Sequence, residues 1–333
     1  MKILTSLTEK KYCKEVNTKK SRGDYTNCPV CNILVRYPTR MSRIVGFQDE
    51  IDEKMQNHPN NGKPEKEEKG KKKKIVFTSR KYLDQLLAHS NGKAYEKLCN
   101  IEYHGVENMK IRKEISESFA ILHAVQECCT VLALNEVQTA VDGIHLENIF
   151  LIDLCSGKGI TTALCGALFP HDGDTGVDGN GSNNFFLAVD KLCAHEVPHF
   201  LNDKHISYLS RDILSDEMFQ ELEQVVHHQT QVEGRTAILV GMHLCGMLSE
   251  RAIEFFDRIP EIKGLVLSPC CLPNKYDMYR KTSFKKEKSG DSYVAWCSHL
   301  QERVDGSGVS HLRQYSDDDM HTTKNAIIVG VRK

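Results

Sequence analysis

The sequence lacks an apolar run long enough to cross a membrane, and it lacks a large excess of charge of either sign. A membrane-spanning helix needs about 20 consecutive apolar residues, and no stretch of the 333 residues is of that kind. The net charge is −1, so the whole chain does not attract nucleic acid strongly, although local patches can still bind it. The amino-terminal segment meets charge too early for a secretory signal. These features predict a chain without a transmembrane helix or a secretory signal, and together with the cysteine pattern described next they predict the cytoplasm or the nucleus.

The chain also lacks the even, regularly spaced cysteines of a disulfide framework. It has 13 cysteines, an odd count, and many lie in apolar stretches such as ECCTVLAL and LIDLC. That pattern is typical of buried free thiols in a reducing compartment. The hydrophobic content of 40% is enough for a buried core, so general disorder is excluded.

The first third of the chain divides into three segments of different composition. Residues 1–56 form a short region of no clear class, and its CPVC stretch at Cys28–Cys31 is a weak zinc signal. Residues 57–74 are charged and almost free of large apolar side chains, which predicts a linker or an exposed loop. Residues 75–108 are expected to form a helical connection. One larger domain remains, at 109–333.

From residue 109 onward, short apolar runs alternate with amphipathic stretches. Strands are expected at 149–154, 185–190, 206–209, 236–242, 263–268, 311–315 and 325–332. Helices are expected at 109–134, 161–169, 192–201, 215–228, 249–259 and 291–304. Strands that alternate with helices indicate a parallel sheet. The pattern therefore predicts a doubly wound α/β domain with a mostly parallel seven-stranded sheet, closed by an antiparallel C-terminal hairpin.

The stretch IFLIDLCSGKG carries the most specific chemistry. An apolar strand ends in Asp153, and a tight turn then holds Ser156, Gly157 and Gly159. Glycines let the backbone approach a ligand closely, and the helix that follows offers free N–H groups to an anion. The dinucleotide fingerprint needs a third glycine where Thr162 stands, which disfavours a nucleotide-dependent oxidoreductase. The remaining alternative is a β–α turn without a ligand.

Two further acidic residues stand where the next two strands end. Asp190 closes the run at 185–190, and Asp212 follows the run at 206–209. A carboxylate at the end of the second strand is where α/β nucleotide folds hold a ribose diol. Each aspartate alone is equally well explained as a helix N-cap. Together with the glycine loop, they favour a nucleoside ligand at the carboxyl edge of the sheet.

With DLCSGKG, these two aspartates and the closing hairpin, the stretch from Met109 to Lys333 resembles the class I S-adenosylmethionine-dependent methyltransferases. The resemblance implies a Rossmann-like methyltransferase fold and S-adenosylmethionine as the cofactor. It implies that the first strand's acid and the glycine loop face the methionine part, that the second acid holds the ribose hydroxyls and that the third contacts the adenine amine. By position, these residues are Asp153, Ser156, Gly157 and Gly159, then Asp190, then Asp212. The chain departs from the family in a Gly- and Asn-rich stretch at 171–184, which lengthens the connection into the second strand.

Histidine and cysteine gather after the fourth and fifth expected strands, which are neighbours in a doubly wound sheet. VGMHLCGMLS carries His243 and Cys245, and VLSPCCLP carries Cys270 and Cys271. Three readings stay open: zinc ligands, small side chains packed at the substrate edge, or a substrate-orienting group or general base at His243. We expect no metal ion, because adjacent cysteines rarely share one tetrahedral ion. The candidate catalytic residues are His243 and Cys270, the latter as a nucleophile if its thiol is activated.

HLCG followed by a Cys-Cys pair resembles a subgroup of these methyltransferases. The subgroup includes the 2′-O-methyltransferase of the tRNA acceptor stem and several uncharacterised methyltransferase-like proteins. The tRNA enzyme carries a His-rich run after its cysteine pair, whereas this chain has CCLPNKY. That departure puts the tRNA substrate in doubt, and it leaves the methyltransferase assignment unchanged.

Two basic runs are candidate contacts for an RNA partner. Lys71–Lys74 and Lys285–Lys288 could bind phosphates, although a solvated linker explains the first run as well. The predicted function is methyl transfer from S-adenosylmethionine, with RNA as a candidate acceptor. The alternatives are a protein or small-molecule acceptor, and a binding protein that keeps the fold without catalysis. The oligomeric state does not follow from the sequence.

Overall fold

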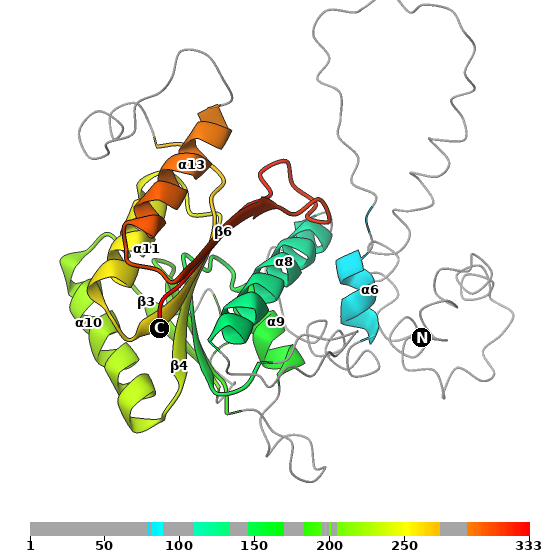
Figure 1. Cartoon of the computed structure of the whole chain (residues 1–333). Coiled ribbons are helices and arrows are strands. Elements are labelled where there is room, and N and C mark those ends of the chain that lie inside the picture. Colours follow the sequence, from blue (N-terminus) through cyan, green and yellow to red (C-terminus); the bar gives the residue numbers. More distant parts are fainter. Residues whose placement is uncertain are drawn as a thin grey trace, which may run out of the picture.

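The structure, a computed structural model, is shown in Figure 1. It describes residues 79, 81–88, 110–132, 146–169, 183–194, 197, 200, 205–273 and 292–333. Several sequence predictions lie outside these residues. They are the N-terminal region 1–56, the linker 57–74, most of the connection 75–108, the basic runs Lys71–Lys74 and Lys285–Lys288, the pair Cys28 and Cys31, and nearly all of 171–184.

A seven-stranded sheet forms the centre of the described part, in the order β3-β2-β1-β4-β5-β7-β6. The strands are β1 (Ile149–Leu154), β2 (Phe185–Asp190), β3 (Ile206–Ser210), β4 (Thr236–Met242), β5 (Ile262–Ser268), β6 (His311–Ser316) and β7 (Ala326–Val331). The first five run parallel to their neighbours, and the hairpin of β6 and β7 joins β5 through an antiparallel pairing. The predicted α/β fold with its closing hairpin is confirmed.

The strand order reverses between β1 and β4. From β1 the chain first adds β2 and β3 on one side, and it then returns to add β4, β5, β7 and β6 on the other side. In open α/β sheets, ligands bind beyond the carboxyl ends of the strands at such a reversal. The topology therefore directs attention to the segments that follow β1, β2 and β4.

Six α-helices are described: α6 (Lys81–Ala88), α8 (Lys110–Val131), α9 (Ile160–Leu168), α10 (Asp216–His227), α11 (Met247–Arg258) and α13 (Ser292–Asp305). A π-helical turn, His228–Val232, extends α10. Only part of the helix expected at 192–201 lies among the described residues, and there the N–H of Val197 donates to the carbonyl of Ala194 and that of Phe200 to the carbonyl of Val197, as in a 3₁₀ turn. The carbonyl of Leu192 accepts hydrogen bonds from the hydroxyls of Tyr208, at 2.8 Å, and Ser210, at 2.7 Å, so this segment is tied to β3.

The helices cover the two faces of the sheet in separate layers (Figure 1). In β1, Ile149 and Leu151 pack into a core with α6, α8 and α9. Phe150 and Ile152 point the other way, into a second core with α10, α11 and α13. Successive side chains of a strand alternate between faces, so a strand covered on both sides is apolar throughout. That is why IFLIDL is a continuous apolar run apart from its aspartate.

Helix α6 packs against α8 and against the turn of the C-terminal hairpin. Tyr82 is buried in the core shared with α8, and its hydroxyl donates a hydrogen bond to Asp317. The ammonium of Lys81 lies 2.7 Å from the carboxylate of Asp319. The sequence segment before the domain thus supplies part of its core. Among the described residues, no helix is long and apolar enough to span a membrane.

Candidate functional site

The turn after β1 holds its backbone in a conformation that side chains rarely adopt. Cys155, Gly157 and Gly159 have φ angles of 54°, 57° and 69°, in the left-handed region that favours glycine. The N–H of Ser156 donates to the carbonyl of Val189 in β2 at 3.0 Å, and the N–H of Gly159 donates to the carbonyl of Ser156 at 2.7 Å. The turn is therefore anchored to β2, and it leads directly into α9.

The two glycines of this turn have different surroundings. A Cβ placed on Gly159 would lie 1.9 Å from Cζ of Phe200, whereas a Cβ placed on Gly157 would meet no heavy atom within 4 Å. Next to Gly157 in the chain, the Oγ of Ser156 is buried and has no hydrogen-bond partner among the described residues. A buried hydroxyl without a partner is costly. The turn thus combines open space with a polar group that a ligand can satisfy.

Asp190 joins the glycine turn to the end of β2. Its Oδ2 accepts a hydrogen bond from the N–H of Gly157 at 2.9 Å, and its Oδ1 accepts one from the N–H of Leu192 at 3.1 Å. Each carboxylate oxygen has two lone pairs, so each can accept a further hydroxyl donor. The structure brings Asp190 and the turn together, and it gives this carboxylate a role in holding the turn that the sequence did not reveal.

Asp153 is buried at the end of β1. Burial raises the pKa of its carboxyl from 3.8 to about 7, with a smaller contribution from the nearby charge of Asp190. The hydroxyl of Thr162 donates to Oδ2 of Asp153 at 2.8 Å, and this hydrogen bond lowers the pKa. Thr162 occupies the position of the missing third glycine, so the departure from the dinucleotide fingerprint supplies a partner for this acid.

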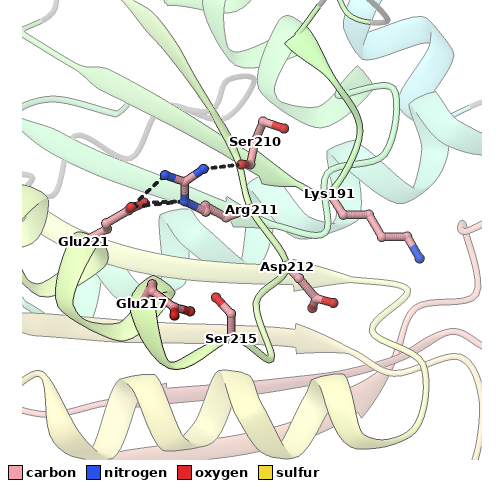
Figure 2. Close-up of a pocket in the computed structure, with 7 residues that line it drawn as sticks. All are labelled: Lys191, Ser210, Arg211, Asp212, Ser215, Glu217 and Glu221. Carbon is pink, nitrogen blue, oxygen red and sulfur yellow. Dashed lines mark hydrogen bonds and ion pairs between the residues drawn. The ribbon is translucent and has the colours of Figure 1, made fainter.

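Asp212 lies in a separate pocket of about 510 Å³ beyond the ends of β2 and β3. Figure 2 shows its lining residues just after β2, at and after the end of β3, and on the first two turns of α10. Arg211 is held by Glu221, with a shortest distance of 2.8 Å, and Asp212 Oδ1 accepts from the N–H of Leu214 at 2.9 Å. Asp212 is exposed and faces the same edge of the sheet as Asp190. The residues that line the pocket are Lys191, Ser210, Arg211, Asp212, Ser215, Glu217 and Glu221.

His243 follows β4 and contacts two residues of α8. Its Nε2 lies 2.8 Å from Oε2 of Glu117 and 3.1 Å from Nζ of Lys113. Lys113 also pairs with Glu117 at 2.7 Å, one helical turn away on the same face. The Glu117 side chain is fully buried, whereas 28% of the His243 side chain is exposed. A buried carboxylate needs a charged or hydrogen-bonded partner, and both of these residues supply one.

The backbone of His243 is strained, with a φ of 59°. Left-handed conformations of residues other than glycine are uncommon, and they gather at functional sites. The N–H of His243 donates to the carbonyl of Ser268 in β5 at 2.9 Å, which fixes the turn. Nε2 can donate to Glu117 or accept from Lys113, but not both at once. In the tautomer that donates to Glu117, Nδ1 is left as the proton acceptor, and no hydrogen bond from the described residues occupies it. Sequence reasoning missed Glu117 and Lys113, which lie far from His243 in the chain.

The cysteines of the two following segments also meet. The sulfur atoms of Cys245 and Cys270 are 3.0 Å apart, and those of Cys270 and Cys271 are 3.4 Å apart. Burial raises the pKa of the Cys270 thiol, and the neighbouring thiols add to this shift. Burial also raises the pKa of Cys245. A raised pKa leaves little thiolate, so the structure offers no support for Cys270 as an activated nucleophile.

No protein-family model matches the sequence, and no curated protein matches it either. Solved structures of similar fold include a SAM-dependent methyltransferase from Aquifex aeolicus, 10% identical over 55% of this chain and 81% of that one, with a TM-score of 0.29. An O-methyltransferase family protein from Burkholderia thailandensis is 12% identical over 77% and 74% of the two chains, with a TM-score of 0.30. The plantazolicin methyltransferase BpumL, solved with SAH, is 10% identical over 75% and 94%, with a TM-score of 0.33. Identities and scores this low do not determine the reaction of this chain.

Proposed function

We propose that the chain binds S-adenosylmethionine at the turn after β1 and transfers its methyl group to an acceptor near His243. The observation that carries the proposal is the Cys155–Gly159 turn, with the open space at Gly157 and the buried Oγ of Ser156, which has no hydrogen-bond partner in the described part of the chain. Asp190 lies against this turn. The fold supports the proposal, because the turn follows the strand at which the sheet order reverses.

The residues present fit the cofactor's functional groups. Asp190 would hold the ribose hydroxyls with the lone pairs that its two backbone hydrogen bonds leave free. The turn and Asp153 would face the methionine part, where a cationic group favours the ionised carboxylate. Asp212, in the neighbouring pocket, would contact the adenine amine. The bound cofactor would supply an electrophilic methyl group on a sulfonium.

His243 would act on the acceptor as a general base through Nδ1. Glu117 would be a positioning residue: by accepting from Nε2–H, 2.8 Å away, it would favour the tautomer that leaves Nδ1 as the proton acceptor. Lys113 neutralises the buried carboxylate. Methyl transfer needs the nucleophile in line with the sulfonium, so positioning supplies much of the rate. A base in reach would add to it by removing the proton of a hydroxyl acceptor.

The cofactor part of the proposal is tested by calorimetric titration of the full chain with S-adenosylmethionine. We expect saturable binding, weakened about ten- to hundredfold in Asp190→Asn, because a charged acceptor of two hydroxyls is lost. Asp216→Asn is the matched control, since Asp216 is an exposed aspartate in the first turn of α10. The proposal fails if the folded wild type releases no heat at about 1 mM cofactor, a concentration that detects even weak sites.

As the acceptor we propose RNA, on the basis of the basic runs Lys71–Lys74 and Lys285–Lys288. Cofactor labelled in its methyl group is incubated with the protein and either total RNA or a protein extract. We expect label in the RNA, and about a hundredfold slower transfer in His243→Ala with cofactor binding retained. Label in the protein fraction alone would contradict the RNA acceptor, and it would leave the cofactor site intact.

A further inference from the structure

Three thiols from two segments meet at the carboxyl ends of β4 and β5. The sulfur atoms of Cys245, Cys270 and Cys271 all lie within 4.8 Å of one another. Cys245 and Cys271 are exposed, and Cys270 is half-buried. The cluster lies outside the cofactor turn, and the proposed methyl transfer does not use it. We propose that these three sulfurs bind a thiophilic divalent cation such as Zn²⁺.

The spacing of the sulfurs fits a tetrahedral ion. Zinc–sulfur bonds are about 2.3 Å long, which places the sulfurs of a tetrahedral site about 3.8 Å apart. The observed separations of 3.0 Å and 3.4 Å need only small side-chain rotations to reach that value. The sequence predicted no ion, because adjacent cysteines rarely share one. In the structure, the sulfurs of the adjacent Cys270 and Cys271 are 3.4 Å apart, and that of Cys245 lies within 4.8 Å of both.

Backbone hydrogen bonds hold the two segments in place independently of the thiols. The N–H of Gly246 donates to the carbonyl of Cys271 at 3.1 Å, and the N–H of His243 donates to that of Ser268 at 2.9 Å. On the other side, the hydroxyl of Tyr293 donates to the carbonyl of Pro269 at 2.9 Å. Fixed loops keep three ligands together at low entropic cost, which favours metal binding over chance proximity.

A disulfide is the main competing use of these thiols. It would join Cys245 to Cys270 and leave the third thiol, Cys271, without a role. The metal site uses all three. Among the described residues, no fourth histidine, cysteine or acidic side chain joins the group, so the fourth position is open to water or to a small ligand. Three protein ligands and one open position are the arrangement of a zinc ion that can exchange a ligand.

The proposal is tested with Co²⁺ as the probe, on the full chain purified under reducing conditions and stripped with a chelator. Cobalt in a tetrahedral thiolate site gives a sulfur-to-metal charge-transfer band and intense visible bands. We expect binding of about one ion per chain at this cluster, and loss of its bands in Cys245→Ser and in Cys271→Ser. Cys193→Ser is the matched control, because Cys193 is an exposed cysteine outside the cluster and should leave the bands unchanged.

Two further measurements keep the test independent of folding and of the N-terminal cysteines. A Cys28→Ser, Cys31→Ser double variant should retain the cluster's bands; if it abolishes all cobalt binding, the proposal is overturned. In the unmutated chain, Zn²⁺ should slow alkylation of the three cluster thiols, as mass spectrometry of their peptides would show. Unprotected thiols, or a Cys245–Cys270 disulfide that persists without metal under reducing conditions, would also overturn it. None of these readouts requires S-adenosylmethionine, so the methyl-transfer proposal can fail separately.

Discussion

The turn after β1 and the turn after β4 follow neighbouring strands, yet they are held in different ways. The first, Cys155–Gly159, is held by residues of its own loop and of β2, through Ser156 N–H, Gly159 N–H and Asp190. The second begins at His243, whose side chain is held by Glu117 of α8, 126 positions earlier in the chain. Hydrogen bonds to a neighbouring strand fix the backbone of both turns, and only the second turn also has a side chain held by a helix that packs across the sheet.

This difference separates two kinds of functional requirement. A cofactor turn has to keep one backbone shape, and glycines with an adjacent strand are sufficient for that. A proton acceptor has to keep one tautomer and one ring orientation, which requires a partner on the ring itself. We therefore expect substitutions in the first turn to alter stability and cofactor binding, and substitutions around the second to alter the rate of transfer.

The largest expected effect is the loss of stability in Gly159→Ala. The methyl group would overlap the ring of Phe200, with a Cβ–Cζ distance of 1.9 Å, and alanine at a φ of 69° costs about 1–2 kcal/mol. With the displacement of a buried ring, the total is about 2–5 kcal/mol. Denaturant unfolding measures it.

Gly157→Ala is the matched control within the same turn. Its φ is 57°, but its Cβ would meet no heavy atom, so only the backbone cost of about 1–2 kcal/mol applies. The same methyl group enters the space proposed for the cofactor. We therefore expect a larger loss in the free energy of cofactor binding than in the free energy of unfolding. Equal losses of stability in the two variants would show that Phe200 does not restrict the turn.

The second prediction separates the two turns. Glu117→Gln should slow methyl transfer about ten- to hundredfold, because an amide fixes the His243 tautomer less strongly than a carboxylate. Cofactor affinity should stay within about twofold, since the described hydrogen bonds and ion pairs of Glu117 go to Lys113 and His243 and not to the first turn. Single-turnover rates as a function of pH, together with calorimetry, measure both quantities.

The matched control is Glu127→Gln, on the same helix. Glu127 also binds a histidine, with 2.9 Å from its Oε1 to Nε2 of His311, but that pair lies at β6, away from the proposed site. The Glu127→Gln variant should be somewhat less stable than the wild type, and its rate of methyl transfer and its pH profile should be unchanged. If both variants slow transfer equally, the effect belongs to α8 packing in general and not to His243.

The sequence was sufficient for the sheet and for the first turn, because their signals are local. Apolar runs of strand length and the DLCSGKG stretch are read within a few residues, and the alternation of strands with helices predicts the mostly parallel sheet. Glu117 carried no such signal, since a glutamate next to Lys113 and Ser116 is typical of an exposed helical face. Its burial depends on how α8 crosses the sheet. The strained φ of His243 was unpredictable for the same reason.

The third prediction concerns pH and Asp153. Its pKa rises from 3.8 to about 7 on folding, so between these values the folded state holds a proton that the unfolded state has lost. The contribution of Asp153 to the free energy of unfolding is therefore fully present below about pH 4 and is lost as the pH rises through about 7. In this range the free energy of unfolding falls by up to about 1.4 kcal/mol per pH unit. In Asp153→Asn that slope should disappear. Parallel stability curves for wild type and variant between pH 5 and 7 would contradict the raised pKa.

The smallest expected effect is also the most specific, and it concerns Thr162→Val. The variant keeps the shape and β-branching of threonine but removes the hydroxyl that donates to Asp153 at 2.8 Å. The loss in the free energy of unfolding should be about 1 kcal/mol where Asp153 is neutral and roughly twice that above about pH 7, because hydrogen bonds to charged groups are stronger.

Thr161→Val is the control. The hydroxyl of Thr161 lies 2.9 Å from that of Ser118, and neither hydroxyl titrates in this range, so the loss of stability in this variant should not change with pH. A pH-dependent difference between the two adjacent variants would show that the first turn is coupled to the charge of Asp153. An equal, constant cost would show that Thr162 only packs against it.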